Sequence, residues 1–149
     1  MTDPWHPHVT VAAVIEHDGK FLFVEEQADD AHVLNQPAGH WEPNETLFAA
    51  AIRETLEETG YRFQPSALVG VYRWAHPLKN LVYLRFAFTG VIVGFDAERA
   101  LDTGILRAVW LTPEELRAQT MPHRSPLVAR CVADYLAGKR YALDLITHF

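Results

Sequence analysis

The sequence has a single cysteine, Cys131, and no apolar run near the roughly 18 residues that a membrane-spanning helix needs. One cysteine excludes an internal disulfide and is compatible with a reducing cytosol. The chain starts with the polar segment Met1–Pro4, so we expect no secretion signal. The sequence therefore predicts a cytoplasmic protein without a membrane segment.

Basic residues are also scarce, with 13 Lys and Arg against 19 Asp and Glu and a formal net charge of −6 at pH 7. Proteins that bind duplex nucleic acid neutralise phosphates with Lys and Arg, so this balance argues against such a partner. A small polyanionic substrate remains compatible with an acidic protein if a bound cation supplies positive charge locally. Length and composition are typical of one globular domain, residues 1–149, as a monomer or a homodimer.

The order of the expected elements predicts an α/β fold of the α+β kind, a mixed sheet flanked by helices on both faces. A tight turn at Asp18–Gly19 predicts a hairpin between strands 8–15 and 20–25. The remaining pattern predicts a loop at 27–33, a short strand at 34–36 and a loop at 37–44. It also predicts strands at 67–75 and 81–93, joined by a turn at 76–80, and a strand at 105–111. Helices are predicted at 46–59, after Thr112 and from Ser125 to Gly138.

The helix expected at 46–59 has two different faces. Thr46 is a suitable N-cap, and Gly60 is suited to the left-handed residue that ends a helix. At about 100° per residue, one side is an apolar stripe expected to pack on the sheet, and three glutamates lie on the opposite side. The stripe is formed by Phe48, Ile52 and Leu56, and the glutamates are Glu54, Glu57 and Glu58. The simplest interpretation of the glutamates is a solvated face.

The positions of these glutamates favour a metal site over a solvated face. Glu54 has like charges three and four residues further on, each repelling by a few tenths of a kcal/mol. Glu57 and Glu58 lie at the negative end of the helix dipole, where each placement costs roughly 0.3–1 kcal/mol, and Arg53 offsets only part of this. A cation held by all-oxygen ligands would remove the penalty, and such ligands favour Mg²⁺ or Mn²⁺ over zinc. The eight histidines show no metal-ligand spacing.

The loop and the helix together resemble the Nudix box, the signature of hydrolases that cleave a nucleoside diphosphate linked to another group. The matching positions are Gly39, Glu45, Arg53, Glu54, Glu57, Glu58 and Gly60. Thr55 and Tyr61 stand where the family usually has aliphatic residues, and Ala38 replaces a frequent glycine. Further similarity to a bacterial phosphatase branch of the family extends from His8 to about Leu143, at 8–11, 35–40, 124–128, Tyr135 and 140–141.

The resemblance implies a Nudix-type α/β/α sandwich and Mg²⁺-dependent hydrolysis of phosphoanhydride bonds. The implied substrates are nucleoside tri- and diphosphates or the thiamine-precursor pyrimidine diphosphate, with release of phosphate. It also implies a catalytic set, Arg53, Glu54, Glu57 and Glu58, and metal ligands, Gly39 through its carbonyl, Glu54, Glu57 and Glu58, for Mg²⁺ or substituting Mn²⁺. Glu45 and Gly60 are expected to be structural parts of the motif.

The general base stays open at this point. Glu54 can bind the metal or can orient and deprotonate the attacking water. Glu42, in the loop beside the box, and Asp102, before the strand at 105–111, are weaker candidates for this role. Arg53 is expected to hold the ligating carboxylates in position.

Candidate substrate contacts come from aromatic and basic residues. Trp41, Tyr72 and Trp74 are candidates to stack on a base. Packing in the core is the usual role of aromatic residues within strands, so Trp41 in the loop is the preferred candidate. Arg124 precedes Ser125–Pro126, where a helix N-terminus can bind an anion. An exposed arginine beside an ordinary helix cap explains the same residues.

Alternative functions are an ADP-ribose or dinucleotide pyrophosphatase, an RNA 5′-pyrophosphohydrolase and, in another class, a catalytically silent nucleotide sensor. The scarcity of basic residues disfavours RNA. The sensor is disfavoured because the last turn of the helix keeps its carboxylates. A zinc hydrolase and a P-loop enzyme are excluded, because neither the His-Glu-x-x-His spacing nor a P-loop motif occurs.

Overall fold

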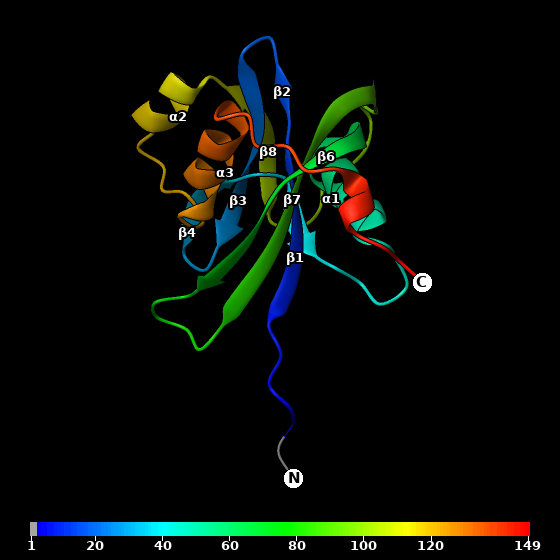
Figure 1. Ribbon diagram of the computed structural model, residues 1–149. Coiled ribbons are helices and arrows are strands. Elements are labelled where there is room, and N and C mark those ends of the chain that lie inside the picture. Colours follow the sequence, from blue (N-terminus) through cyan, green and yellow to red (C-terminus); the bar gives the residue numbers. More distant parts are fainter. Residues whose placement is uncertain (1–2) are drawn as a thin grey trace.

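A computed structural model describes residues 3–149 (Figure 1). Met1 and Thr2, part of the polar start on which the expected absence of a secretion signal rests, lie outside the described residues. In chain order the elements are β1 (His8–Val14), β2 (Glu16–His17), β3 (Lys20–Ala28), β4 (Ala31–Asn35), β5 (Ala38–His40), α1 (Leu47–Thr59), β6 (Tyr61–Ala75), β7 (Val82–Phe95), β8 (Ile105–Leu111), α2 (Pro113–Ala118), α3 (Leu127–Leu136) and the 3-10 turn η1 (Leu143–Leu145). No helix of the described part is long and apolar enough to cross a membrane.

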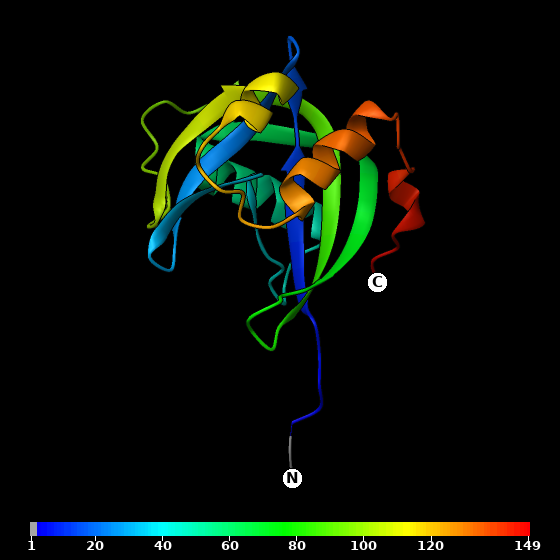
Figure 2. The ribbon, with the colours of Figure 1, turned by 90° about the vertical axis from the view of Figure 1, so that its left-hand side faces the viewer.

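The strands form two four-stranded sheets. The mixed sheet has the order β5-β1-β7-β6, in which β1 and β7 are parallel and the other pairs are antiparallel. The second sheet is antiparallel and has the order β2-β3-β4, with β8 paired to the other side of β3. Figure 2 shows α3 in front of the mixed sheet and α1 behind it. The expected mixed sheet flanked by helices is therefore confirmed, and a second sheet accompanies it.

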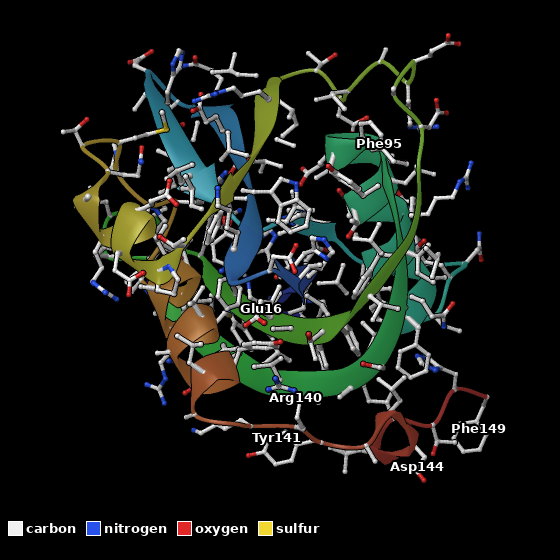
Figure 3. The ribbon with its side chains drawn as sticks, turned by 90° about the horizontal axis from the view of Figure 1, so that it is seen from above. Glu16, Phe95, Arg140, Tyr141, Asp144 and Phe149 are labelled. Atoms are coloured by element: carbon white, nitrogen blue, oxygen red, sulfur yellow. The ribbon has the colours of Figure 1, made fainter. Side chains whose placement is uncertain are left out.

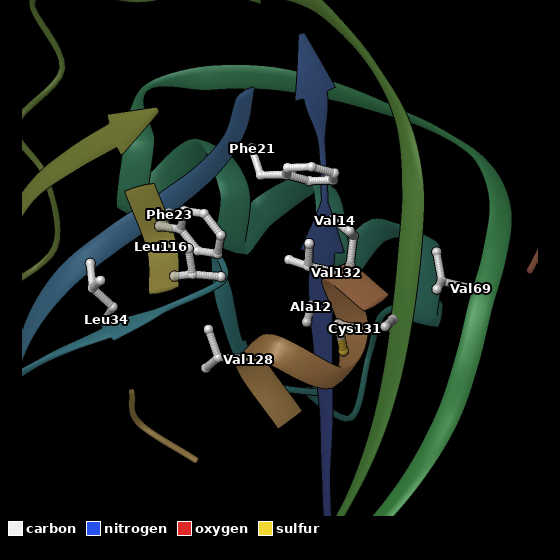
Figure 4. Packing of buried hydrophobic residues seen from close by; sticks show 11 residues of the cluster. Ala12, Val14, Phe21, Phe23, Leu34, Val69, Leu116, Val128, Cys131 and Val132 are labelled. Carbon is white, nitrogen blue, oxygen red and sulfur yellow. The ribbon is translucent and has the colours of Figure 1, made fainter. Parts of the chain in front are cut away.

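The protein has a hydrophobic core on each face of the mixed sheet, and strand β1 contributes side chains to both, because successive side chains of a strand point to opposite faces. Val11 and Ala13 face the core that includes α1, and Ala12 and Val14 face the core that includes α3. Figure 4 shows the α3 side, where Phe21, Phe23, Leu116, Val128, Cys131 and Val132 pack around Ala12 and Val14. The elements that carry the functional side chains are thus fixed on two faces of one buried strand.

The predicted hairpin between 8–15 and 20–25 is wrong in its first strand. The turn at Asp18–Gly19 forms as expected, with positive φ at both residues. Across this turn, however, β3 pairs with the two-residue β2, and the Ile15 carbonyl accepts the Leu22 N–H, whereas β1 pairs with β5 and β7 in the other sheet. The physical reason is burial, because a strand that is apolar on both faces is most stable in the middle of a covered sheet.

The predicted loops at 27–33 and 37–44 are partly wrong. Strand β3 continues to Ala28 and pairs with β4, so only the turn between them is irregular. Within the second loop, β5 pairs with β1. Polar composition suggested loops here, but backbone pairing decides the structure, through a local hairpin for β3 and β4 and through the distant strand β1 for β5.

The predicted buried face of α1 is partly right, because Phe48 and Ile52 pack against the core while only partly buried. A neighbouring face is buried more deeply, through Leu47, Ala50, Ala51, Thr55, Glu58 and Thr59. Small residues on this deeper face let the helix backbone approach the sheet closely, and two threonine hydroxyls are satisfied by carbonyls one turn earlier. The glutamates therefore face the protein and not bulk solvent.

The predicted caps of α1 and α2 agree with the structure, whereas α3 is shorter at each end than the predicted 125–138. The Thr46 hydroxyl accepts a hydrogen bond from the Ala49 N–H at 3.0 Å, and Gly60 ends α1 with a φ of 79°. Helix α2 begins after Thr112 with a complete capping box, and β8 spans the residues expected for it. These local signals depend only on neighbouring residues, which is why the sequence reveals them.

The segment after α3 returns along the outer edge of the mixed sheet, as Figure 3 shows for Arg140, Tyr141, Asp144 and Phe149. Tyr141 exchanges backbone hydrogen bonds with Leu68 of β6 at 2.8 Å in both directions. The ring of His148 accepts a hydrogen bond from the Leu47 N–H at 3.2 Å. The tail thus covers an open strand edge and satisfies a free donor at the N-terminus of α1.

Candidate active site

Three carboxylates from two segments converge at the C-terminal half of α1. One oxygen of each of Glu54, Glu57 and Asp102 lies within 4.8 Å of the other two. The Glu54 and Glu57 side chains are 13% and 25% exposed. The loop between β7 and β8 brings Asp102 here because its backbone N–H donates to the Glu57 carbonyl at 3.0 Å. This hydrogen bond also satisfies one of the free carbonyls at the end of α1.

The electrostatics of the three carboxylates favour a bound cation. Burial raises the pKa of Glu54, against the opposing effect of Arg53, and Glu57 and Asp102 raise it further. Burial also raises the pKa of Glu57, and the neighbouring Asp102 adds to this shift. Like charges so close destabilise the ionised forms, and a hard divalent cation would neutralise them.

Arg53 is the charge partner of this cluster within the protein. Its guanidinium donates to both Glu45 oxygens at 2.8 and 3.0 Å, to Glu54 at 2.8 Å and to Glu57 at 3.2 Å. A further hydrogen bond of 3.1 Å reaches the His40 carbonyl at the end of β5. One planar side chain thus fixes two carboxylates of the cluster and the neighbouring loop.

Glu45 and Glu42 differ in how firmly they are held. A Glu45 oxygen also accepts the Glu42 N–H at 3.0 Å, and the hydrogen bond from Arg53 lowers the pKa of the Glu45 carboxyl. The Glu42 side chain is 62% exposed and lies 3.7 Å from Arg53. Glu45 is therefore placed to brace the loop, and Glu42 lies at its exposed edge.

Glu58 is placed differently from the other glutamates of α1. It is 7% exposed, and one carboxyl oxygen accepts the Ala38 N–H at 2.9 Å. Burial raises the pKa of Glu58 to about 9 despite this hydrogen bond. Its carboxyl thus joins α1 to β5, next to the cluster formed by Glu54, Glu57 and Asp102.

Gly39 lies against the Glu54 carboxylate. It pairs with Val11 in the middle of β5, and a Cβ at this position would overlap all three atoms of the Glu54 carboxylate. Arg53 donates a hydrogen bond of 2.8 Å to the same carboxylate, so an added Cβ would have to displace the carboxylate from this contact. The position therefore requires glycine for close approach and not for an unusual φ.

Replacing Gly39 by Ala is expected to displace the Glu54 carboxylate while the fold is kept. We expect at least a tenfold weaker affinity for Mn²⁺, which is about 1.4 kcal/mol, measured by calorimetry. The melting temperature of the metal-free protein should change little, because the obstructed atoms are the end of a flexible side chain. Unchanged Mn²⁺ affinity would show that Glu54 does not bind the metal.

A cavity of about 210 Å³ lies on the other side of β5, between the two sheets. Its lining includes Thr10, Trp74, Tyr83 and Arg85 from the mixed sheet, Glu26 and Asn35 from the second sheet, Ala38, Gly39 and His40 of β5, and Arg124 and Ser125 before α3. Because Gly39 contacts Glu54 and also lines the cavity, the cavity adjoins the carboxylate cluster. Two lining arginines, Arg85 and Arg124, provide the local positive charge that an acidic protein otherwise lacks.

The structure separates the four expected substrate contacts into two pairs. Trp74 and Arg124 line the cavity. Trp41 is 42% exposed, its ring N–H donates to the Glu45 carbonyl at 2.7 Å, and it is not among the residues that line the cavity. The Tyr72 hydroxyl donates to Asp134 at 2.7 Å in the contact between β6 and α3. Trp74 and Arg124 are thus the better-placed candidates.

Sequence analysis missed most of the polar residues in the cavity. Arg85 is the clearest case, because it is 6% exposed within the largely apolar strand β7. A lone charged residue in such a strand indicates a candidate functional residue, since burying a charge without a partner is costly. Glu26 and Asn35 carry no such signal, because their strand pattern resembles that of an exposed edge.

Comparison with known proteins places this geometry in a family. A family model described as the NUDIX domain matches residues 4–131. The chain belongs to the Nudix family. The matched range contains β5, α1, Asp102 and Arg124, so both the carboxylate cluster and the cavity lie in the family domain. The chain is accordingly a hydrolase.

Individual relatives agree with this assignment. The chain is 42% identical over 143 residues to proteins described as "Phosphatase NudJ" from Shigella flexneri and Escherichia coli, covering 96% of this chain and 92% of the relatives. A solved structure described as a NUDIX hydrolase from Nitrosomonas europaea is 52% identical, with a TM-score of 0.94 over 97% of this chain and 98% of that chain. The NUDIX domain of Shewanella oneidensis NrtR, complexed with ADP ribose, shares the fold at 15% identity and a TM-score of 0.71 over 91% of this chain and 94% of that chain.

Proposed function

We propose that this Nudix hydrolase uses Mg²⁺ to cleave phosphoanhydride bonds in small nucleoside tri- and diphosphates or in a pyrimidine diphosphate, and that it releases phosphate. The observation that carries the proposal is the convergence of Glu54, Glu57 and Asp102 beside a cavity that contains Arg85 and Arg124. The similarity to proteins described as phosphatases supports the same class of reaction.

The donor set fits a hard divalent cation. Glu54, Glu57 and Asp102 offer carboxylate oxygens close enough to share one ion, and Glu58 and the Gly39 carbonyl are proposed as further ligands. When bound, Mg²⁺ would lower the pKa of a coordinated water and neutralise charge on the phosphate oxygens. Mn²⁺ would substitute for it, because both ions prefer oxygen ligands.

Arg53, Asp102 and Arg124 have three different proposed roles in the reaction. Arg53 holds Glu54 and Glu57 in the geometry that a metal ion needs. Asp102 is the most exposed of the three clustered carboxylates, so it is the proposed acceptor of the proton from the attacking water. Arg124, at the opening of the cavity, is placed to neutralise a phosphate.

The test of this function is a substrate panel with Mg²⁺, scored by the phosphorus-containing product. We expect nucleoside di- and triphosphates to yield inorganic phosphate and all turnover to stop when EDTA is added. Two mononucleotide fragments from a dinucleotide or ADP-ribose would support a pyrophosphatase instead. Nucleotide binding without turnover would indicate a sensor.

The two tryptophans give a test of where the base binds. Replacing Trp74 by Ala is expected to raise KM for nucleotides about tenfold with little change in kcat, because stacking on a base contributes about 1–3 kcal/mol. Replacing Trp41 by Ala should raise KM less, since Trp41 lies outside the cavity lining. The reverse order, measured by steady-state kinetics, would place the base against the loop that carries Trp41.

A further inference from the structure

Asp102 is the one member of the carboxylate cluster that does not belong to α1. Glu54 and Glu57 are fixed by the helix, and Arg53 donates hydrogen bonds to them at 2.8 and 3.2 Å. The ion pairs of residues 3–149 include both glutamates but not Asp102. The position of the Asp102 carboxylate therefore depends on the backbone of the loop between β7 and β8.

A tight turn places Asp102 at the end of α1. Its carbonyl accepts the Ile105 N–H at 3.0 Å, and its own N–H donates to the Glu57 carbonyl at 3.0 Å. Gly104, the third residue of the turn, has a φ of 92°, and Thr103 before it is not among the residues with positive φ. This combination is that of a type II turn, which requires a left-handed residue at the third position.

The same turn is attached to the second sheet. The Gly104 carbonyl accepts the Gln27 N–H of β3 at 2.8 Å. Two residues further on, the register of the pairing between β3 and β8 shifts, so that Leu106 lies opposite no residue of β3. Such a β-bulge changes the direction of the chain beside it. The turn, and with it Asp102, is thus held between the end of α1 and β3.

Gly104 is needed here for its backbone conformation and not for space. A Cβ added to Gly104 would meet no atom within 4 Å, unlike a Cβ at Gly39. Residues other than glycine and asparagine rarely adopt a positive φ, because their Cβ approaches the neighbouring carbonyl. A larger residue would therefore act by moving the backbone of the turn, and Asp102 is the first residue of that turn.

We propose that Gly104 is a positioning residue for the cation site. By allowing the turn, it keeps an Asp102 oxygen within 4.8 Å of oxygens of Glu54 and Glu57 before a cation binds. A ligand that is already in place saves the free energy of ordering it on binding. The inference rests on the proposed function, since it concerns the cation of that site.

The first test compares Gly104→Ala with Gly138→Ala. Gly138 follows α3, has a φ of 84° and also has no atom within 4 Å of an added Cβ, so both substitutions impose the same kind of strain. Both should lower the melting temperature of the metal-free protein by about 3 °C. Only Gly104→Ala should weaken Mn²⁺ binding, at least fivefold by calorimetry. Gly104→Asn should keep most of the affinity, because asparagine tolerates this turn position.

The second test asks whether Gly104 acts through Asp102. Asp102→Asn is expected to weaken Mn²⁺ binding at least tenfold, and adding Gly104→Ala should weaken it no further, because the positioned carboxylate is already lost. Equal Mn²⁺ affinity of Gly104→Ala and the wild type would overturn the inference. Losses that multiply in the double variant would also overturn it, since the effect of Gly104 would then not pass through Asp102.

These binding measurements need no turnover, so they separate the inference from the proposed function. The expected pattern of Mn²⁺ affinities without hydrolysis of any nucleotide would refute the proposed function and leave the role of Gly104 standing. Undiminished Mn²⁺ affinity in Asp102→Asn would remove Asp102 from the cation site and overturn the inference, whether or not nucleotides are hydrolysed.

Discussion

Replacing Glu57 by Gln is expected to lower kcat by about 10³-fold, because the cation would lose a direct carboxylate ligand, and even neighbours of such ligands contribute roughly 10–100-fold. The same change should raise the stability of the metal-free protein by up to about 1 kcal/mol. It removes repulsion with Asp102 and a negative charge from the C-terminal end of α1, at the loss of one 3.2 Å contact with Arg53. Steady-state kinetics with Mg²⁺ and urea unfolding in EDTA measure the two effects.

The predicted loss of kcat together with a gain in stability distinguishes a metal ligand from a residue that only stabilises the fold. A side chain that served only to stabilise the fold would lose activity and stability together. Glu114→Gln is a suitable control, because Glu114 lies exposed in the first turn of α2 and its ion pair among residues 3–149 is with Arg117 at 3.5 Å. We expect kcat to stay unchanged in that variant and stability to fall by a few tenths of a kcal/mol, the opposite sign to Glu57→Gln, because the dipole favours a negative charge there. Retained activity in Glu57→Gln would mean that the glutamates of α1 form an ordinary polar surface.

Replacing Arg53 by Gln is expected to destabilise the metal-free protein by about 2 kcal/mol and to lower kcat/KM by about a hundredfold. The change leaves Glu45, Glu54 and Glu57 without their shared cation and frees the loop at the His40 carbonyl. Unfolding measured with and without Mn²⁺ should show that the metal restores part of the lost stability, because it supplies the missing positive charge.

Two further variants define the role of Arg53. Arg53→Lys keeps the charge but cannot contact Glu45 through two nitrogens, so its stability should lie between those of the wild type and Arg53→Gln. Arg107→Gln removes an exposed arginine whose ion pair among the described residues is with Glu25, and it should cost less than about 1 kcal/mol. If Mn²⁺ gave no greater stabilisation to Arg53→Gln than to Arg107→Gln, the electrostatic coupling between Arg53 and the metal site would be refuted.

The sequence predicted local features well because they depend on short-range chemistry. The caps of α1 at Thr46 and Gly60 follow from a hydroxyl acceptor and a left-handed glycine. The strand over Ile105–Leu111 and the capping box at Thr112 were equally visible. The family motif identified the residues around Gly39 and Arg53 through fixed spacing.

Features that depend on tertiary contacts were not predictable in this way. Periodicity placed Phe48, Ile52 and Leu56 toward the core, but the small side chains of Ala50 and Ala51 allow closer packing, and this outweighs hydrophobicity. Strand β1 was assigned to a local hairpin because its partner residues in β7 lie 75 positions further along the sequence, as His8 and Tyr83 do. Long-range pairing leaves no mark in local composition.

In the candidate site, too, the residues that meet through tertiary contacts were harder to predict than those of the local motif. Asp102 was only a weak candidate from sequence, and it joins Glu54 and Glu57 through a loop whose path depends on the end of α1. The cavity residues Glu26, Asn35 and Arg85 come from three strands in two sheets. Their proximity arises only when the two sheets pack together.

The most direct test of the carboxylate cluster as a metal site is an anomalous difference map from crystals grown with Mn²⁺. We expect a strong peak bounded by the carboxylates of Glu54, Glu57 and Asp102, next to Gly39, and no such peak in crystals of Glu57→Gln. Absence of a peak at saturating Mn²⁺, or a peak held by other residues, would contradict the central claim that this cluster holds the cation on which hydrolysis depends.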